Sequence, residues 1–134
     1  MSHLGLVTIV VNDYDEAIRF FVEVLAFDLV EDVASTTNDG RPKRWVVVRP
    51  PNAVTGLLLA QADGEAQQAV VGEQTAGRVG FFLRVDDFDS TLARMRAAEV
   101  KLVGEPRVEP YGQVVVFQDV AGNRWDLLGP PSSD

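Results

Sequence analysis

The sequence contains one pattern twice, and this duplication restricts the possible folds more than any other feature. Residues 11–30 and residues 85–103 each pass from the end of an apolar strand through a polar turn into an amphipathic helix and a second apolar strand. The turn reads Asp-Tyr-Asp at 13–15 and Asp-Phe-Asp at 87–89. A tandem duplication predicts two similar modules related by a pseudo-twofold axis, and we expect a cleft and a ligand site near that axis.

The two copies align with offsets that change along the chain. The offset is 74 residues from the pair Asp13 and Asp87 onward, and it becomes 73 at Phe27 and Val100. In the later strands residues 46–48 align with residues 114–116, and residues 57–59 align with residues 125–127, at an offset of 68. The repeat therefore allows candidate site positions to be located in pairs.

Hydrophobic periodicity and turn residues define the expected elements. The first module is predicted to hold strands at 4–11, 27–32, 44–49 and 56–60, with a helix that starts after the capping pair Asp13 and Glu16. The second module is predicted to hold strands at 79–85, 100–103, 114–117 and 124–128, with a helix at 87–98. We therefore expect an α+β fold of two tandem βαβββ modules that form curled mixed sheets around a cleft.

The length of 134 residues suits one domain, which we expect to comprise residues 1–134. Within this domain we assign residues 4–62 to module 1 and residues 77–129 to module 2. The intervening residues 63–76 are mostly small and polar and form the expected linker.

Charge and composition exclude several classes of function. The net charge of −8 argues against nucleic acid and against an anionic membrane surface, because both require clustered Lys and Arg. No apolar run approaches the ~20 residues of a membrane span, and the first residues lack the basic region of a signal peptide. The chain has no cysteine, which excludes disulfides, thiolate ligands and a cysteine nucleophile. These features predict a cytoplasmic protein.

Four segments resemble the vicinal oxygen chelate superfamily, which includes glyoxalase I, extradiol dioxygenases and bleomycin-resistance proteins. They read VVNDYDEAIRFF in the first half and RVGFFLRVDDFD, EPYGQVVVFQD and AGNRWDLL in the second half. The resemblance covers nearly the whole chain, about residues 4–129. It implies paired βαβββ modules whose sheets curl around a cavity, and a homodimer. It does not by itself imply one activity, because members of one fold carry out different chemistry.

The resemblance also implies where a metal would be held. In the metal-dependent members, His or Glu ligands come from the opening and closing strands of each module, which correspond here to Leu6, Leu58, Gly80 and Asp126. Aliphatic side chains and glycine cannot coordinate a cation, and one carboxylate does not hold a catalytic metal. We therefore predict no metal ligand and no cofactor, with a divalent metal expected only if this alignment is shifted.

His3 is the one histidine of the chain. Three residues before Leu6 on a regular strand, it would point to the face opposite Leu6. We interpret it as a partly exposed residue near the amino terminus, with a strand bulge as the alternative that would bring it into the cavity.

The expected ligand pocket consists of side chains on the same strand faces as these four positions, with aromatic residues nearby. Its predicted members are Leu6, Thr8, Trp45, Leu58, Gly80, Phe82, Arg84, Tyr111, Trp125 and Asp126. Core packing is the alternative for the apolar members, including both tryptophans, and a plain turn position is the alternative for Tyr111. Asp126 is the candidate general acid or base, since burial in a cavity raises a carboxyl pKa. A structural ion pair with Arg84 or Arg44 is its alternative.

Three functions remain open from the sequence, and catalysis is uncertain. The first is a glyoxalase- or bleomycin-resistance-like protein without the metal ligands, which binds a small apolar or aromatic molecule in the cavity between the modules. The second is a glyoxalase-like lyase or isomerase, or a dioxygenase, with an unorthodox metal set or with Asp126 as general base. The third is a dimeric structural module with no ligand. The expected partners are therefore a small-molecule ligand and a second copy of the chain.

Overall fold

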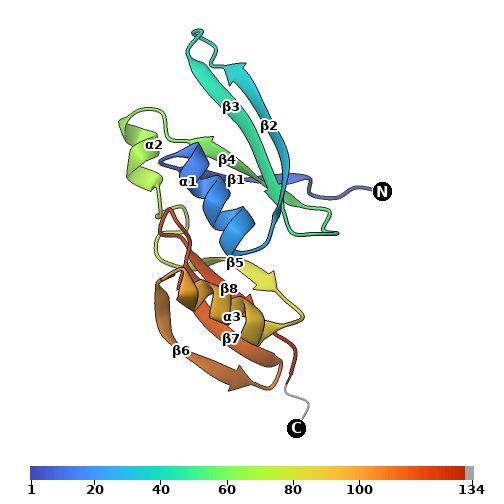
Figure 1. Ribbon diagram of the computed structural model, residues 1–134. Helices are drawn as coiled ribbons and strands as arrows, with labels where there is room; N and C mark the ends of the chain where they lie inside the picture. Colours follow the sequence, from blue (N-terminus) through green and yellow to red (C-terminus); the bar gives the residue numbers. More distant parts are fainter. Residues whose placement is uncertain (132–134) are drawn as a thin grey trace. The chain divides into compact units, whose positions relative to one another are not determined.

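The computed structural model describes residues 1–131 and divides into two compact units, Met1–Val71 and Gly72–Asp134. Each unit holds a four-stranded mixed sheet with a helix between its first two strands (Figure 1). This arrangement confirms the predicted α+β class and the duplicated βαβββ order.

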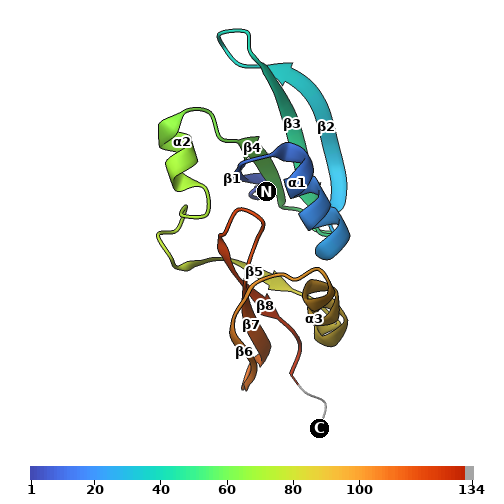
Figure 2. The same ribbon diagram turned by 60° about the vertical axis from the view of Figure 1, so that its left-hand side comes forward.

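The sheet of unit 1 has the strand order β1 (Leu6–Val11), β4 (Gly56–Gln61), β3 (Pro42–Arg49) and β2 (Asp28–Thr36). Strands β1 and β4 are parallel, and the other neighbours are antiparallel. Helix α1 (Tyr14–Arg19) runs into a π-helical turn, η1 (Phe20–Val24), and covers one face of this sheet (Figure 2). Apolar side chains of the helix and of the sheet pack together in one buried core, which includes Ile9, Ala17, Phe21, Val46, Val48 and Leu59.

Unit 2 repeats this topology with the order β5 (Val79–Arg84), β8 (Arg124–Leu128), β7 (Gly112–Gln118) and β6 (Leu102–Glu109). Helix α3 (Phe88–Ala97) covers one face of the sheet. Its buried side chains are Phe88, Thr91, Leu92 and Met95, which face a core that includes Leu83, Val115, Phe117, Trp125 and Leu127.

Helices α1 and α3 are each capped by an aspartate at their first turn, as predicted for α1 from Asp13. The Asp13 carboxylate accepts a hydrogen bond from the Glu16 backbone N–H at 2.8 Å, and the Asp87 carboxylate accepts one from the Ser90 N–H at 3.0 Å. Such caps satisfy backbone donors that have no partner inside the helix. The two caps fix equivalent starting points for α1 and α3.

The π-helical turn explains why the alignment offset changes from 74 to 73. The Phe27 N–H donates to the Phe21 carbonyl six residues earlier, whereas the Val100 N–H donates to the Met95 carbonyl five residues earlier. A π turn accommodates one extra residue inside a helix. Unit 1 therefore absorbs its extra residue in η1, before the chain turns at Ala26 with a φ of 60°.

One expectation about the strands needs correction. The sequence alignment matches residues 46–48 with 114–116, but Val116 lies opposite Asp126 where Val47 lies opposite Leu58. The true equivalence in β7 is therefore shifted by one residue. The segment predicted as a linker contains a short exposed helix, α2 (Glu65–Val70), whose Glu, Ala and Gln residues favour helix. Among the described residues, no helix is long and apolar enough to span a membrane.

Candidate functional site

Unit 1 contains a cavity of about 370 Å³ at the end of the sheet where β3 and β4 separate. We call it the β3–β4 cavity. Its lining residues are Tyr14, Thr37, Arg41, Pro42, Lys43, Arg44, Trp45, Leu58, Leu59, Ala60, Gln61, Ala62, Asp63 and Gln67. This volume lies within the range of about 300–1,000 Å³ that is usual for small-molecule sites.

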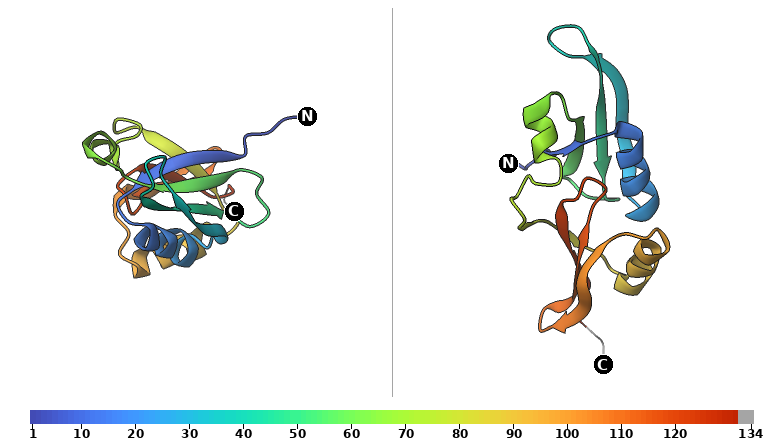
Figure 3. Two further views of the ribbon diagram at one scale, coloured as in Figure 1. Left: turned by 90° about the horizontal axis from the view of Figure 1, so that it is seen from above. Right: turned by 90° about the vertical axis from the view of Figure 1, so that its left-hand side faces the viewer.

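The cavity exists because the hydrogen-bonded ladder between β3 and β4 ends early. The described register runs from Val48 opposite Leu57 to Val46 opposite Leu59, and it would next bring Arg44 opposite Gln61. The Arg44 N–H instead donates to the Tyr14 hydroxyl at 3.2 Å. Beyond this point β3 continues with β2 as a two-stranded ribbon past the end of β4 (Figure 3).

In unit 2 the equivalent ladder stays closed. Strands β7 and β8 pair from Gln118 opposite Arg124 to Val114 opposite Leu128, and the Gly129 N–H then donates to the Gln113 carbonyl at 2.9 Å. The corrected register makes Gln113 the counterpart of Arg44 and Gly129 the counterpart of Gln61. The ladder position that is open in unit 1 is therefore occupied by a backbone hydrogen bond in unit 2.

Two residue differences account for this contrast. Phe88 of unit 2 takes the place of Tyr14 and has no hydroxyl that could accept a backbone N–H. A Cβ atom on Gly129 would lie 2.6 Å from the Phe88 Cβ, which real Cβ atoms do not tolerate. Gln61 has a Cβ at this position, so unit 1 cannot adopt the tight packing that closes unit 2.

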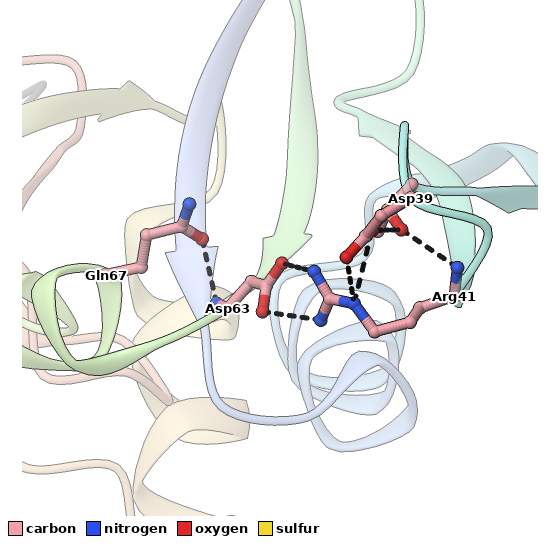
Figure 4. A network of polar contacts seen from close by, with 5 residues as sticks. Asp39, Arg41, Asp63 and Gln67 are labelled. Carbon is pink, nitrogen blue, oxygen red and sulfur yellow. Dashed lines mark hydrogen bonds and ion pairs between the residues drawn. The ribbon is translucent and has the colours of Figure 1, made fainter.

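Arg41, Asp63 and Gln67 of the cavity lining belong to a network of polar contacts (Figure 4). The Arg41 guanidinium bonds both Asp63 carboxylate oxygens at 2.8 Å, and its Nε bonds Asp39 at 3.0 Å. Asp39 also accepts a short hydrogen bond from the Thr37 hydroxyl, and the Asp63 N–H donates to the Gln67 side chain. These contacts join the tip of the β2–β3 hairpin to the segment after β4. The hydrogen bonds from Arg41 lower the pKa of Asp63.

A second arginine lies where the cavity meets α1. The Arg44 guanidinium bonds Asp32 at 2.7 Å and Asp15 at 2.9 Å, and its central carbon is 5.1 Å from the centre of the Tyr14 ring. The hydrogen bond from Arg44 lowers the pKa of Asp32, and the two carboxylates raise the pKa of Arg44. Cation–π contact and ion pairs together fix Tyr14 beside the open ladder.

Of the residues predicted for the pocket, four belong to unit 1. Thr8 lies opposite Leu58 on the neighbouring strand, and Leu6 is two residues earlier on the same face. Trp45 and Leu58 line the β3–β4 cavity. The Trp45 side chain is 40% exposed, and its indole N–H donates to the Glu31 carboxylate at 2.6 Å. Glu31 therefore orients the indole ring, which remains partly exposed.

The predicted residues of unit 2 gather mainly on one sheet face. Phe82 lies opposite Asp126, and Arg84 lies opposite Leu128. Gly80 lies at a register shift of β5, and a Cβ there would be 2.5 Å from the Thr75 side chain. Burial raises the pKa of Asp126, while the positive charge of Arg107 opposes this rise. The ion pair with Arg84 or Arg44 that the sequence left open is absent from the described residues.

The two remaining aromatic candidates differ in burial. Tyr111 is 56% exposed in the turn between β6 and β7. Trp125 is 3% exposed and stacks on Phe81 with ring centres 4.7 Å apart. Its indole N–H donates to Asp119 at 2.9 Å. Of the two roles left open for Trp125, the structure therefore favours core packing.

The four positions that correspond to metal ligands do not fit a cation. Leu6 and Leu58 lie on the same face of neighbouring strands, where two aliphatic side chains offer no donor atom. Residues 1–131 contain no group of three or more His, Asp or Glu side chains placed to hold a metal. His3 is exposed and precedes β1, so the face alternation expected for a strand does not apply to it.

Sequence reasoning missed several residues of the cavity, chiefly Tyr14, Arg41 and Gln61. Tyr14 enters the sequence-based prediction only through the Asp-Tyr-Asp turn at 13–15, and Arg41 and Gln61 have no predicted role there. A signal was present in the duplication, because Tyr14 aligns with Phe88 at the offset of 74 and Gln61 aligns with Gly129 at 68. The two copies therefore differ at one end of the ladder, where unit 1 has the Tyr14 hydroxyl and unit 2 has Gly129.

Comparison with known proteins assigns the fold. The family model described as "Glyoxalase/Bleomycin resistance protein/Dioxygenase superfamily" matches residues 3–127. An uncharacterized protein of Shewanella frigidimarina is 49% identical over 124 residues, which cover 91% of this chain and 89% of that protein. The structure of TnmS3, "an antibiotic binding protein from Streptomyces sp. CB03234", matches with a TM-score of 0.73 and 32% identity, covering 97% of each chain. A glyoxalase family protein from Bacillus cereus matches in fold, with a TM-score of 0.79 and 20% identity over 98% of this chain and 96% of that one.

Proposed function

Because the chain belongs to the glyoxalase/bleomycin resistance protein/dioxygenase superfamily, we propose that it binds a small aromatic or apolar molecule without a metal, in the β3–β4 cavity. The observation that carries the proposal is the open ladder between β3 and β4. It creates a cavity of ligand size, with Trp45 and Leu58 as its apolar walls.

Three further features support a binding role. Trp45 presents a half-exposed indole that Glu31 orients, and aromatic stacking is a common means of holding planar molecules. The four metal-ligand positions carry one carboxylate between them. TnmS3, which is 32% identical to this chain, is described as an antibiotic binding protein, and this likeness supports a binding role.

The proposal is tested by titrating 2-ethylnaphthalene into nitrogen-15-labelled protein. We expect saturable amide shift changes in residues 37–45 and 58–63, and the same affinity after dialysis against EDTA. Leu58→Trp fills the cavity and should weaken binding at least about tenfold, since it removes the volume that the probe occupies. Leu4→Trp adds the same side chain at an exposed position outside the cavity and serves as the matched control. Equal binding by both variants would place the probe elsewhere and contradict the proposal.

A second candidate function is acid–base catalysis by Asp126, in a glyoxalase-like or dioxygenase-like reaction. Burial raises the pKa of its carboxyl group, which brings it nearer the range useful for proton transfer. Elemental mass spectrometry of freshly purified protein tests the metal-dependent version of this function. Turnover that survives Asp126→Asn would exclude the acid–base version.

We also infer a homodimer that acts in the cytoplasm. Strand β2 is an edge strand whose residues are all exposed, and these include the apolar Leu29, Val30 and Val33. Apolar edge strands are commonly covered by a partner. Light scattering that gives a mass of one chain at micromolar concentration would contradict the dimer, and cell fractionation tests the location.

A further inference from the structure

We propose that the β3–β4 cavity selects an aromatic molecule that carries a carbonyl oxygen, and that Tyr14 is the residue that recognises this oxygen. The inference rests on the proposed function, which places an aromatic ligand in the same cavity. It adds the chemical group by which the ligand is chosen.

Tyr14 supplies the first hydrogen-bond donor. It is the first residue of α1, it lines the cavity, and its side chain is fixed beside Arg44. Its hydroxyl oxygen accepts the Arg44 N–H at 3.2 Å. A phenol also has one hydrogen to donate, and within residues 1–131 no acceptor receives it. This O–H is therefore available to an oxygen atom in the cavity.

Gln61 supplies the second donor through its backbone. The neighbouring Ala62 N–H donates to the Val11 carbonyl at 2.8 Å, on the β1 side of β4. Backbone groups of successive strand residues point to opposite sides, so the Gln61 N–H points to the β3 side. The equivalent N–H of unit 2, from Gly129, donates to Gln113. In unit 1 the register ends before Gln61 reaches Arg44, and its N–H faces the cavity.

These two donors favour a carbonyl oxygen over a hydrocarbon. A carbonyl oxygen has two lone pairs and can accept from both a hydroxyl and an N–H. A hydrocarbon group at the same place would displace water and leave both donors without a partner, which is unfavourable. The indole of Trp45 and the side chain of Leu58 contact the remaining, aromatic part of such a molecule.

The test compares 2-acetylnaphthalene with 2-ethylnaphthalene, which differ by a carbonyl oxygen in place of two hydrogens. Dissociation constants are measured by NMR titration for the wild type and for Tyr14→Phe. We expect the wild type to bind the acetyl compound about fivefold more tightly, as one or two neutral hydrogen bonds provide. In Tyr14→Phe this preference should fall to about twofold, because the hydroxyl donor is gone and only the Gln61 N–H remains.

The ratio separates recognition from structural damage, since a loosened cavity weakens both compounds alike. A variant that keeps the fivefold preference, or a wild type with no preference, would overturn the inference while leaving the proposed function intact. Saturation by neither compound would contradict both proposals. Should Tyr14→Phe fail to fold, the wild type gives an independent measurement. The Gln61 amide proton should shift downfield with the acetyl compound alone, and equal shifts with both compounds would also overturn the inference.

Discussion

The two units of this protein have the same strand order, yet only one of them closes its central ladder completely. In unit 2, Gly129 fits against Phe88 and extends the pairing of β7 and β8. In unit 1, Gln61 occupies the position equivalent to Gly129, and the Tyr14 hydroxyl accepts the hydrogen bond from the Arg44 N–H. The comparison teaches that a cavity can arise in a duplicated fold from two side-chain differences at one end of a ladder.

The turns that precede β4 and β8 provide the largest expected difference between the units. Asp119 is buried and accepts hydrogen bonds from the backbone of Ala121, Gly122 and Asn123 and from the Trp125 indole. Burial raises its pKa, while these donors oppose the rise. Unit 1 has Pro50 and Pro51 in the corresponding turn, which fix the chain without a carboxylate.

We predict that Asp119→Ala lowers the free energy of unfolding by about 3 kcal/mol, because several buried donors lose their acceptor. Urea denaturation followed by tryptophan fluorescence measures the loss. Asp86→Ala, at an exposed position of the same unit, should change stability by less than about 0.5 kcal/mol. A loss of similar size in both variants would show that the hydrogen bonds to the buried Asp119 carboxylate do not stabilise the fold more than an exposed aspartate does.

The next prediction concerns the glycine that closes unit 2. Gly129→Ala should destabilise the protein by about 2 kcal/mol, since the added Cβ would press on the Phe88 Cβ and push β8 from β7. The Gly129 amide should then exchange with solvent faster, as the bond to Gln113 weakens. Gly5→Ala is the control, because a Cβ there meets no atom within 4 Å. Unchanged stability of Gly129→Ala would remove the steric explanation for the difference between the units.

A smaller effect is expected where the two helices end in the same way. Ala26 has a φ of 60° and Glu99 a φ of 58°, a left-handed backbone that costs non-glycine residues energy. Ala26→Gly and Glu99→Gly should each raise stability by about 0.5 kcal/mol, less than the full left-handed cost because glycine also loses more entropy on folding. Thermal denaturation measures both. A gain in Glu99→Gly alone would mean that the π turn of unit 1 holds Ala26 in place by other contacts.

The smallest effect involves Arg44, whose counterpart in unit 2 is the uncharged Gln113. Arg44 lowers the pKa of Asp32 in the folded protein. The ion pair between them therefore stabilises the protein fully above the unfolded pKa of Asp32, and this stabilisation is lost as the pH falls through the folded pKa. Arg44→Gln should raise the titration midpoint of Asp32, followed by carboxyl carbon NMR, and cost less than about 0.5 kcal/mol at neutral pH. At a pH below both pKa values of Asp32, loss of this ion pair should no longer make the variant less stable than the wild type. An unmoved midpoint would exclude the ion pair.

The sequence predicted well those elements that local chemistry determines. The capping residue Asp13 locates the start of α1, and the predicted start of α3 at Asp87 is within one residue of the observed one, because a cap needs contacts only one turn away. The predicted strand 114–117 lies within β7, but its alignment with residues 46–48 was wrong by one residue, because Val114, Val115 and Val116 are identical side chains. A run of identical residues contains no period-two signal that would show which of them faces the core.

The candidate site was predicted less completely, because it depends on contacts between distant residues. Tyr14 and Arg44 are 30 residues apart in the chain, and Arg41 and Asp63 are 22 apart. Alternation along a strand identifies Leu58 and Thr8 as neighbours of one face, but it does not reveal that a ladder stops. Alternation also does not distinguish core packing from ligand binding for Trp125, whose stacking on Phe81 is seen only in the structure.

The early end of the β3–β4 ladder has a thermodynamic consequence for any molecule that occupies it. A ligand that satisfies the Gln61 N–H takes the role that a neighbouring strand has in unit 2, so binding and local folding become one linked equilibrium. The free energy of unfolding should then rise by RT ln(1 + L/Kd), where L is the free ligand concentration and Kd the dissociation constant, and the melting temperature should rise with it. The melting temperature of this protein should therefore indicate what fraction of the β3–β4 cavity is occupied by ligand.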